Sequence, residues 1–360
     1  MSHSRPVQVH INTAALQHNS QRVRELVPNS KIMAVIKADG YGHGMEIVAD
    51  ALSSSVDEFA VNSLDDVLRI RNAGFDKAIT VLSANFNKQQ LLELVKLNAR
   101  ITLYDSTQLP VLASLDEKLN LSIWLKVDTG MGRLGFLPEE LPNTLDQVNK
   151  IKAVSNISLM THLANADQVD NPASGKQIDV FNELAAVNQF TELSILNSAG
   201  VLALPEYALQ RVRPGIMLYG ISPLVNQSAE QLGLQAVMTF KSKLISIRRL
   251  PAGSSIGYGS TYVVDDDTRI GVIACGYGDG YPRHAPTGTP VLINGLIVPL
   301  IGRVSMDMIC VDLNNITAKV GDDAILWGEG NPVEVVADYA QTIAYELVCG
   351  ILPRVERIVN

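Results

Sequence analysis

The sequence has few cysteines, and none of them has a close neighbour of its own kind. Cys275, Cys310 and Cys349 stand singly along the 360 residues, so the sequence predicts neither a disulfide framework nor a thiolate metal cage. The six histidines are also scattered, and no two of them have the i, i+4 spacing of a zinc-binding helix. These absences argue against a metal enzyme.

A net basic charge and long apolar runs are missing as well. The formal net charge is −8, which provides no positive patch to attract nucleic acid or anionic lipid. The amino-terminal segment becomes polar and helix-patterned within about ten residues, unlike a secretory signal, and no run of about 18 apolar residues indicates a membrane span. We therefore expect a cytoplasmic protein that binds neither nucleic acid nor membranes.

What the sequence does contain is a regular rhythm of short apolar runs. They occupy residues 31–38, 58–63, 78–83, 99–105, 121–128, 157–164, 193–200 and 211–220. Between them, residues 64–74, 87–98 and 176–190 repeat apolar side chains every three or four positions, which is typical of amphipathic helices. The alternation predicts an α/β fold, a (β/α)8 TIM-type barrel, with an open doubly wound sheet as the alternative.

The pattern changes after residue 232. Successive strands with Gly, Pro and Asn turns are indicated at residues 239–250, 268–280, 289–313 and 323–330. The pair Asn294 and Gly295 between two apolar runs predicts a hairpin. We therefore predict a barrel domain at residues 8–232 and a mostly β C-terminal domain at residues 233–360, completed by an N-terminal strand at residues 1–7.

Polar residues follow the predicted barrel strands, at the end where barrel active sites are built. They are Lys37, Lys126, His162, Asn197, Ser198 and Arg213. The hydroxyl of Ser198 and the backbone amides near Gly215 and Ile216 are typical of a phosphate site. A desolvated lysine after an apolar run can form an imine. Lys37 and a phosphate site together indicate pyridoxal phosphate or a sugar-phosphate aldolase intermediate, and Arg213 suits a partner for a pyridine nitrogen.

Eight stretches, in order along nearly the whole chain, resemble the bacterial alanine racemases, the fold-type III pyridoxal phosphate enzymes. The matching stretches are VIKADGYGHG (35–44), LKVDTGMGRLG (125–135), THLANAD (161–167), LNSAG (196–200), VRPGIMLYG (212–220), IGYGSTY (256–262), GYGDGYPR (276–283) and GRVSMDM (302–308). A single such motif is weak, but eight in the family's order are specific.

The resemblance implies a role for each cofactor-site residue. Lys37 would carry pyridoxal phosphate as an imine, and Arg213, held by His162, would face the pyridine nitrogen. The other implied cofactor-binding residues are Tyr41, Asn197, Ser198, Gly215 and Ile216, with all but Asn197 at the phosphate. Arg133 would reach the phenolic oxygen and the substrate carboxylate. Lys126 would be carbamylated, which gives Arg133 an anionic partner.

The resemblance also implies the reaction. Racemisation of alanine needs a base on each face of the α-carbon: Tyr258 for the L enantiomer and Lys37 for the D enantiomer. The product D-alanine would supply peptidoglycan. Tyr258 would reach the barrel of another subunit, which implies a homodimer with shared active sites. Met306 would bind the substrate carboxylate through its amide, and Tyr277 and Arg283 would line the passage to the site.

The shape of the passage and several alternative functions stay open at this point. Pro353 stands where well-known members have a tyrosine, which leaves the shape of the passage open. A racemase of broader specificity is an alternative, although such relatives are typically exported. A barrel decarboxylase should have an acidic residue in place of Arg213, and a non-catalytic pyridoxal phosphate carrier would lack Tyr258. His43 is interpreted as part of its loop, and His284 as solvated.

Overall fold

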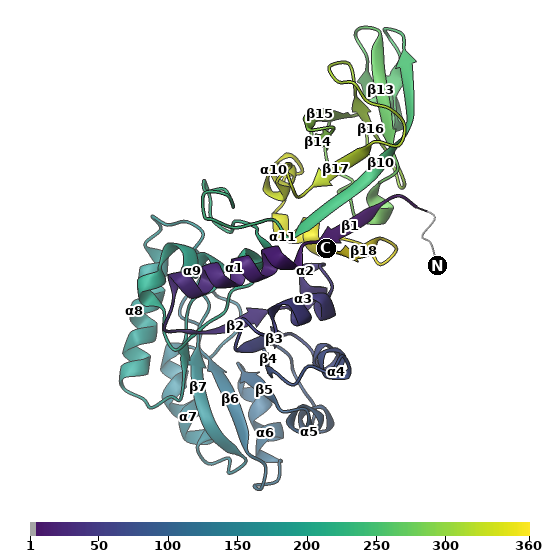
Figure 1. The fold of residues 1–360 in the computed structure, drawn as a ribbon. Helices are drawn as coiled ribbons and strands as arrows, with labels where there is room; N and C mark the ends of the chain where they lie inside the picture. Colours follow the sequence, from purple (N-terminus) through teal and green to yellow (C-terminus); the bar gives the residue numbers. More distant parts are fainter. Residues whose placement is uncertain (1–4) are drawn as a thin grey trace.

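A computed structural model describes residues 5–360, so residues 1–4 of the predicted strand at 1–7 lie outside the described part. The chain forms a barrel surrounded by helices and an elongated β domain that projects from one end of it (Figure 1). Both parts have the predicted class. Among residues 5–360, no helix is long and apolar enough to cross a membrane.

Eight parallel strands form the barrel, in the order β8-β7-β6-β5-β4-β3-β2-β9. They are β2 (Lys31–Val35), β3 (Glu58–Val61), β4 (Ala78–Val81), β5 (Ala99–Leu103), β6 (Leu121–Lys126), β7 (Val154–Met160), β8 (Leu193–Ser194) and β9 (Arg211–Val212). A parallel bridge between Asn197 and Arg213 joins the two edges. The TIM-type prediction is confirmed, and all eight predicted runs contain a strand.

The barrel strands end earlier than predicted. β2 stops at Val35, so Lys37 lies beyond the strand and begins a separate turn, α2 (Lys37–Tyr41). The last two strands contain two residues each. Pro214 follows β9 and has no N–H to extend a ladder, and Ser198 already begins a helix. These early ends place Lys37, Asn197 and Arg213 beyond their strands.

Helices surround the barrel, and the predicted three are confirmed. They are α1 (Thr13–Leu26), α3 (Met45–Leu52), α4 (Leu64–Asn72), α5 (Lys88–Lys96), α6 (Leu109–Ala113), α7 (Leu141–Val148), α8 (Ala173–Ala186) and α9 (Ser198–Ala203). Ser63 accepts a hydrogen bond from Asp66 N and caps the start of α4. Gly74, at φ 87°, follows its end.

The main sheet of the C-terminal domain has the order β13-β16-β15-β14-β17-β10-β1-β18, with a further pairing of β13 to β10. A separate two-stranded sheet pairs β11 (Ser255–Ile256) with β12 (Tyr262–Val263). Its strands are β1 (Gln8–Ile11), β10 (Met238–Leu250), β13 (Thr268–Ile273), β14 (Pro290–Ile293), β15 (Leu296–Ile301), β16 (Ile309–Asp312), β17 (Asp323–Trp327) and β18 (Glu356–Val359). Asn294 and Gly295 have φ values of 51° and 79° and form the predicted hairpin turn between β14 and β15.

An amino-terminal strand does join this sheet, but it lies at residues 8–11, directly after the predicted segment and inside the range assigned to the barrel. It pairs antiparallel with β10 and parallel with β18. Two short helices also belong to this domain: α10 (Val333–Tyr339) and α11 (Ala344–Cys349). Helix α11 packs against α2 and brings the C-terminal domain to the mouth of the barrel (Figure 1).

Candidate active site

A cavity of about 370 Å³ opens at the carboxyl ends of the barrel strands. Ten of the predicted site residues line it: Lys37, Tyr41, Lys126, Arg133, His162, Asn197, Ser198, Arg213, Gly215 and Ile216. They come from the ends of β2, β6, β7, β8 and β9, which the parallel barrel places at one mouth. Buried Val35 and Met160 belong to a small cluster inside the barrel and line the floor.

The cavity carries positive charge without an acidic partner. Lys37, Lys126, Arg133 and Arg213 line it, whereas none of the lining residues, all within 5–360, is Asp or Glu. Uncompensated buried charge is costly, so the cavity is built for an anionic ligand. Burial and the charge of Arg133 lower the pKa of Lys37, which increases the fraction of its amine that is neutral and nucleophilic.

The turn that follows Lys37 is left-handed. Ala38, Asp39, Gly40 and Tyr41 have φ values of 54°, 54°, 61° and 52°. This conformation costs roughly 1–2 kcal/mol for each residue that is not glycine, so surrounding contacts must hold it. Gly42 N donates to Ala38 O at 3.0 Å and Gly44 N to Asp39 O at 2.9 Å.

Two arginines from distant elements also hold this turn. Arg69 of α4 donates to the Asp39 carboxylate at 2.9 Å. Arg357 of β18 donates to Gly42 O at 2.9 Å and pairs with Asp39 at 3.3 Å. A Cβ on Gly42 would lie 1.9 Å from Val348 O of α11, so this position tolerates only glycine. The position of Lys37 and Tyr41 therefore depends on the C-terminal domain of the same chain.

Hydroxyl groups and bare backbone meet at the other side of the cavity. Ser198 Oγ accepts hydrogen bonds from Gly215 N at 2.8 Å and Met217 N at 3.3 Å. A Cβ on Gly215 would lie 2.6 Å from the hydroxyl of Tyr41. The hydroxyls of Tyr41 and Ser198 thus converge on the Gly215 backbone. This is the composition of a small oxyanion cradle.

Arg213 is fully fixed at the back of the cavity. Its guanidinium donates to the Ser194 hydroxyl and the Thr161 carbonyl, and to Ile195 O at 3.3 Å. Burial lowers its pKa to about 10, which leaves it charged near neutral pH. These hydrogen bonds hold the Arg213 side chain. Within residues 5–360, Arg213 has no hydrogen bond to His162.

His162 is neutral in this environment. Burial, followed by the charge of Arg213 and then Lys126, lowers its pKa to about 3. It lines the cavity beside these cations without adding to their charge. Asn197, the next predicted residue, caps α9 by accepting from Gly200 N at 2.9 Å and donates to Leu163 O at 3.4 Å.

Lys126 and Arg133 flank a loop organised by one carboxylate. Asp128 accepts hydrogen bonds from four backbone amides in residues 130–133, at 2.8 to 3.1 Å. Burial opposes ionisation, but these bonds lower the pKa of Asp128. Burial, then the charges of Arg213, Arg133 and Lys37, lower the pKa of Lys126 to about 8. The pKa of Lys126 therefore lies close enough to neutral pH for part of its amine to be unprotonated there.

Sequence analysis missed three aromatic or thiol side chains near the loop of residues 37–44, which carries Lys37 and Tyr41. Tyr345 and Cys349 of α11 line the cavity, and the ring of Tyr345 lies 6.1 Å from that of Tyr41. Tyr219 stacks on Tyr41 with ring centroids 4.8 Å apart. Pro353 is exposed and does not line the cavity. Only an apolar helical pattern at 344–349 could have indicated α11.

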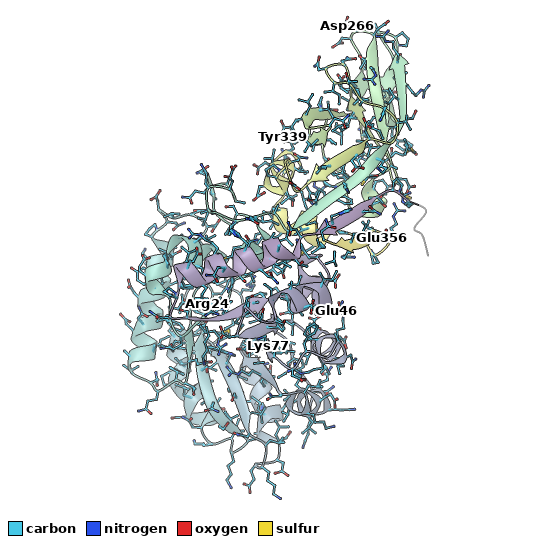
Figure 2. All side chains as sticks on the ribbon, viewed as in Figure 1. Arg24, Glu46, Lys77, Asp266, Tyr339 and Glu356 are labelled. Atoms are coloured by element: carbon cyan, nitrogen blue, oxygen red, sulfur yellow. The ribbon has the colours of Figure 1, made fainter. Side chains whose placement is uncertain are left out.

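The remaining four predicted residues, Tyr258, Tyr277, Arg283 and Met306, do not line this cavity. All four are exposed on the C-terminal domain, and Tyr258 exposes 69% of its surface. Tyr258 begins the turn η5 (Tyr258–Ser260), and Tyr277 begins η6 (Tyr277–Asp279). Figure 2 shows Asp266, in the segment after η5, at the tip of the domain away from the barrel.

Tyr277 and Met306 lie on neighbouring turns. Tyr277 N donates to Ser305 O at 3.0 Å, and Gly278 N donates to Met306 O at 2.8 Å. Asp279, fully buried, pairs with Arg5 at 2.9 Å and with Arg354 at 2.8 Å. Both arginines also pair with the neighbouring Asp307, at 3.2 and 2.8 Å. The ion pairs lock the two turns together, so one chain carries two separate sets of predicted site residues.

Comparison with known proteins identifies the family. Residues 11–223 match the family described as "Alanine racemase, N-terminal domain", and residues 237–359 match "Alanine racemase, C-terminal domain". The chain belongs to the alanine racemase family. The resemblance seen in the eight motifs is thereby confirmed.

Relatives in the alanine racemase family match along the full length. The alanine racemase of Nitrosospira multiformis is 44% identical over 357 residues, which is 99% of each chain. The one from Aeromonas hydrophila is 46% identical over 347 residues, 96% of this chain and 97% of the relative. The structure of the biosynthetic alanine racemase from Pseudomonas aeruginosa superposes with a TM-score of 0.95 at 38% identity and covers 99% of both chains.

Proposed function

We propose that this protein is an alanine racemase that interconverts L-alanine and D-alanine with pyridoxal phosphate bound in the barrel cavity. The observation that carries the proposal is the cavity itself. It brings Lys37 together with three further cations and an oxyanion cradle. The full-length similarity to proteins named alanine racemase supports the same reaction.

The residues present fit pyridoxal phosphate. Its phosphate suits the cradle of Tyr41, Ser198 and Gly215, where a side chain on Gly215 would collide with the Tyr41 hydroxyl. Its pyridine nitrogen suits Arg213, which donates hydrogen bonds but cannot protonate a base at neutral pH. When bound, the cofactor withdraws electrons from the substrate and makes the α-proton removable. An unprotonated ring nitrogen moderates that withdrawal, which suits racemisation.

The chain's own residues then bind and move the proton. Arg133 binds the substrate carboxylate at the mouth of the cavity. Lys37 Nζ accepts the α-proton of the D enantiomer and returns a proton to the same face, and its lowered pKa keeps the neutral form accessible. His162, neutral because of burial, adds no charge next to Arg213.

The opposite face of the substrate needs a second base. We assign it to Tyr258 of the partner subunit in a homodimer, because Tyr258 is exposed and does not line its own chain's cavity. Met306, through its backbone amide, joins Arg133 at the substrate carboxylate, and Tyr277 and Arg283 line the passage. The protein works in the cytoplasm, where D-alanine supplies peptidoglycan.

The test follows deuterium and cofactor together. The purified protein should show a visible absorbance from bound pyridoxal phosphate, which borohydride reduction and Lys37→Ala both remove. In deuterated water, either enantiomer of alanine should take up deuterium at the α-carbon. Tyr258→Phe should slow proton removal from L-alanine more than from D-alanine, because it removes one of two bases. A colourless protein without deuterium uptake would sink the proposal, and equal slowing would contradict the two-base assignment.

A further inference from the structure

His43 belongs to the loop that carries Lys37 and Tyr41, and its side chain is completely buried. It exposes none of its surface and lies two residues after Tyr41. Its Nδ1 lies 2.8 Å from Tyr41 O and 3.1 Å from Gly40 O. Its Nε2 is buried and has no partner within the described residues. A solvated or indifferent loop histidine would not have these contacts.

The contacts fix the state of the ring. Because both neighbours of Nδ1 are carbonyl oxygens, Nδ1 must carry the hydrogen and donate it. Nε2 is then the unprotonated nitrogen, which has the lower cost of burial without a partner. Burial lowers the pKa of His43 to about 4, so the side chain stays neutral over the physiological range. His43 is therefore a fixed donor and has no acid–base role.

Its donor closes the left-handed turn. Gly40 O also accepts a hydrogen bond from His43 N at 3.1 Å, whereas Tyr41 O accepts one from the imidazole. Tyr41 itself has φ 52°, so it lies outside a regular right-handed helix, in which its carbonyl would accept a hydrogen bond from the backbone four residues on. The imidazole supplies that partner and fixes the backbone that carries the Tyr41 ring.

The ring of His43 also supports Tyr41 from behind. The centroid of His43 lies 4.6 Å from that of Tyr219, and Tyr219 stacks on Tyr41 at 4.8 Å. Tyr219 Oη donates to Val35 O at 3.0 Å, which ties the stack to the last residue of β2. The His43, Tyr219 and Tyr41 rings thus form a column that ends at the Gly215 cradle.

We propose that His43 is a positioning residue, whose Nδ1–H holds the Tyr41 hydroxyl at the phosphate of the cofactor. This inference rests on the proposed function, because it assigns Tyr41 to the phosphate. By this proposal, a preference for pyridoxal phosphate over pyridoxal depends on a residue that does not line the cavity. His43 touches neither substrate nor cofactor and acts through Tyr41 alone.

A matched pair of variants isolates the donor. His43→Asn keeps an N–H at the position of Nδ1 and loses the ring, whereas His43→Leu has nearly the same shape and no donor. The measurement is the affinity of each apoprotein for pyridoxal phosphate and for pyridoxal, which lacks the phosphate. His43→Leu should lose about tenfold in affinity for pyridoxal phosphate because a buried carbonyl is left unpaired, while its affinity for pyridoxal should change little. His43→Asn should keep most of the wild-type preference.

A double-mutant cycle with Tyr41→Phe tests the route of the effect. If His43 acts through the Tyr41 hydroxyl, His43→Leu should cost little further affinity once that hydroxyl is gone. Circular dichroism and thermal unfolding show whether each variant is folded. If His43→Leu does not fold, His43→Phe replaces it as the donor-free variant, because it keeps an aromatic ring and lacks the donor.

Three outcomes overturn the inference while leaving the proposed function in place. They are an equal loss of affinity for both ligands in the donor-free variant, an unchanged affinity of that variant for both ligands, and additive losses in the double-mutant cycle. If the wild-type apoprotein itself does not prefer pyridoxal phosphate to pyridoxal, the proposed function fails and the role of His43 fails with it. No step of this test requires racemase activity.

Discussion

At the scale of single residues, Lys126 is the side chain whose chemical state matters most. It is one of four cations around the cavity, and burial together with Arg213 and Arg133 lowers its pKa to about 8. The neutral amine is the form that reacts with carbon dioxide. The product is an anion among cations, which relieves the repulsion that lowers this pKa.

We therefore predict that Lys126 is carbamylated. Carbon-13 NMR of the protein in labelled bicarbonate should show a carbamate signal that Lys126→Ala lacks. The kcat/KM of Lys126→Ala should fall by about tenfold, because Arg133 loses a charge-assisted partner. Absence of the signal near pH 8 in the wild type would contradict the prediction.

Sequence analysis could place many residues of the site but not their backbone. Polar side chains after apolar runs marked Lys37 and Arg213, because strand ends share one barrel mouth. The left-handed turn was not predictable, because Ala38 and Tyr41 disfavour it locally and distant contacts impose it. His43 was interpreted as an ordinary loop residue for the same reason. Its partners are backbone carbonyls of the left-handed turn, which the sequence did not predict.

At the scale of elements, the end of the barrel opposite the site is closed by an ion network. Glu192, just before β8, pairs with Arg211 at 2.8 Å, Arg100 at 2.9 Å and Lys31 at 3.1 Å. These residues lie at or near the amino ends of β9, β5 and β2. Burial opposes ionisation, but the hydrogen bonds and charge of Arg211, with the other partners, lower the pKa of Glu192 to about 2.

The network predicts how stability depends on pH. The folded pKa of Glu192 lies below its unfolded value of 4.5, so its stabilisation is full above about pH 4.5 and is lost as the pH falls toward 2. Glu192→Gln should lower the free energy of unfolding at pH 7 by about 3 kcal/mol and by less at pH 3, measured by urea denaturation. Glu58 pairs with the same Arg211 at 2.7 Å, and burial raises its pKa, so the loss in Glu192→Gln is measured against the wild type at each pH.

A matched control for this prediction lies on a helix surface. Glu93 of α5 pairs with Lys96 at 3.3 Å, with both side chains exposed. Glu93→Gln should change the free energy of unfolding by less than about 0.5 kcal/mol. An equal loss for both variants, or a loss in Glu192→Gln that does not shrink in acid, would contradict the role of the network.

Elements were predictable where their signal is local. Apolar runs predicted the barrel strands, and apolar side chains repeating every three or four positions predicted the three helices. The position of β1 and the existence of β18 were not predictable, because each is a short strand whose partner lies some 348 residues away in sequence. Helix α11 was missed because it is only six residues long.

At the scale of the whole molecule, the chain carries two half-sites that do not meet. Lys37 lies in the barrel cavity, whereas Tyr258 is exposed on the C-terminal domain. That domain projects from the barrel (Figure 1). Two copies placed head to tail would pair each barrel with the other copy's domain. The alternative is that one chain bends to close its own site.

Mixing two inactive variants distinguishes these arrangements. Lys37→Ala and Tyr258→Ala should each be inactive, but a mixture that has exchanged subunits should recover about a quarter of the wild-type activity. In such a heterodimer, one of the two sites has both wild-type bases. If the mixture stays inactive after exchange, each site is made by one chain. Sedimentation of the wild type provides the oligomeric state.

The bond from Arg357 to Gly42 O has a consequence for synthesis. β1 is translated before the barrel, whereas its parallel partner β18 is translated after the other strands of the C-terminal domain. Arg357 lies in that last strand and holds the turn that carries Lys37 and Tyr41. A nascent chain can therefore close its barrel early, since most barrel contacts are made between successive strands. It cannot fix the turn that carries Lys37, the proposed catalytic lysine, until β18 has been translated. Chains that lack β18 should therefore be partly folded and inactive.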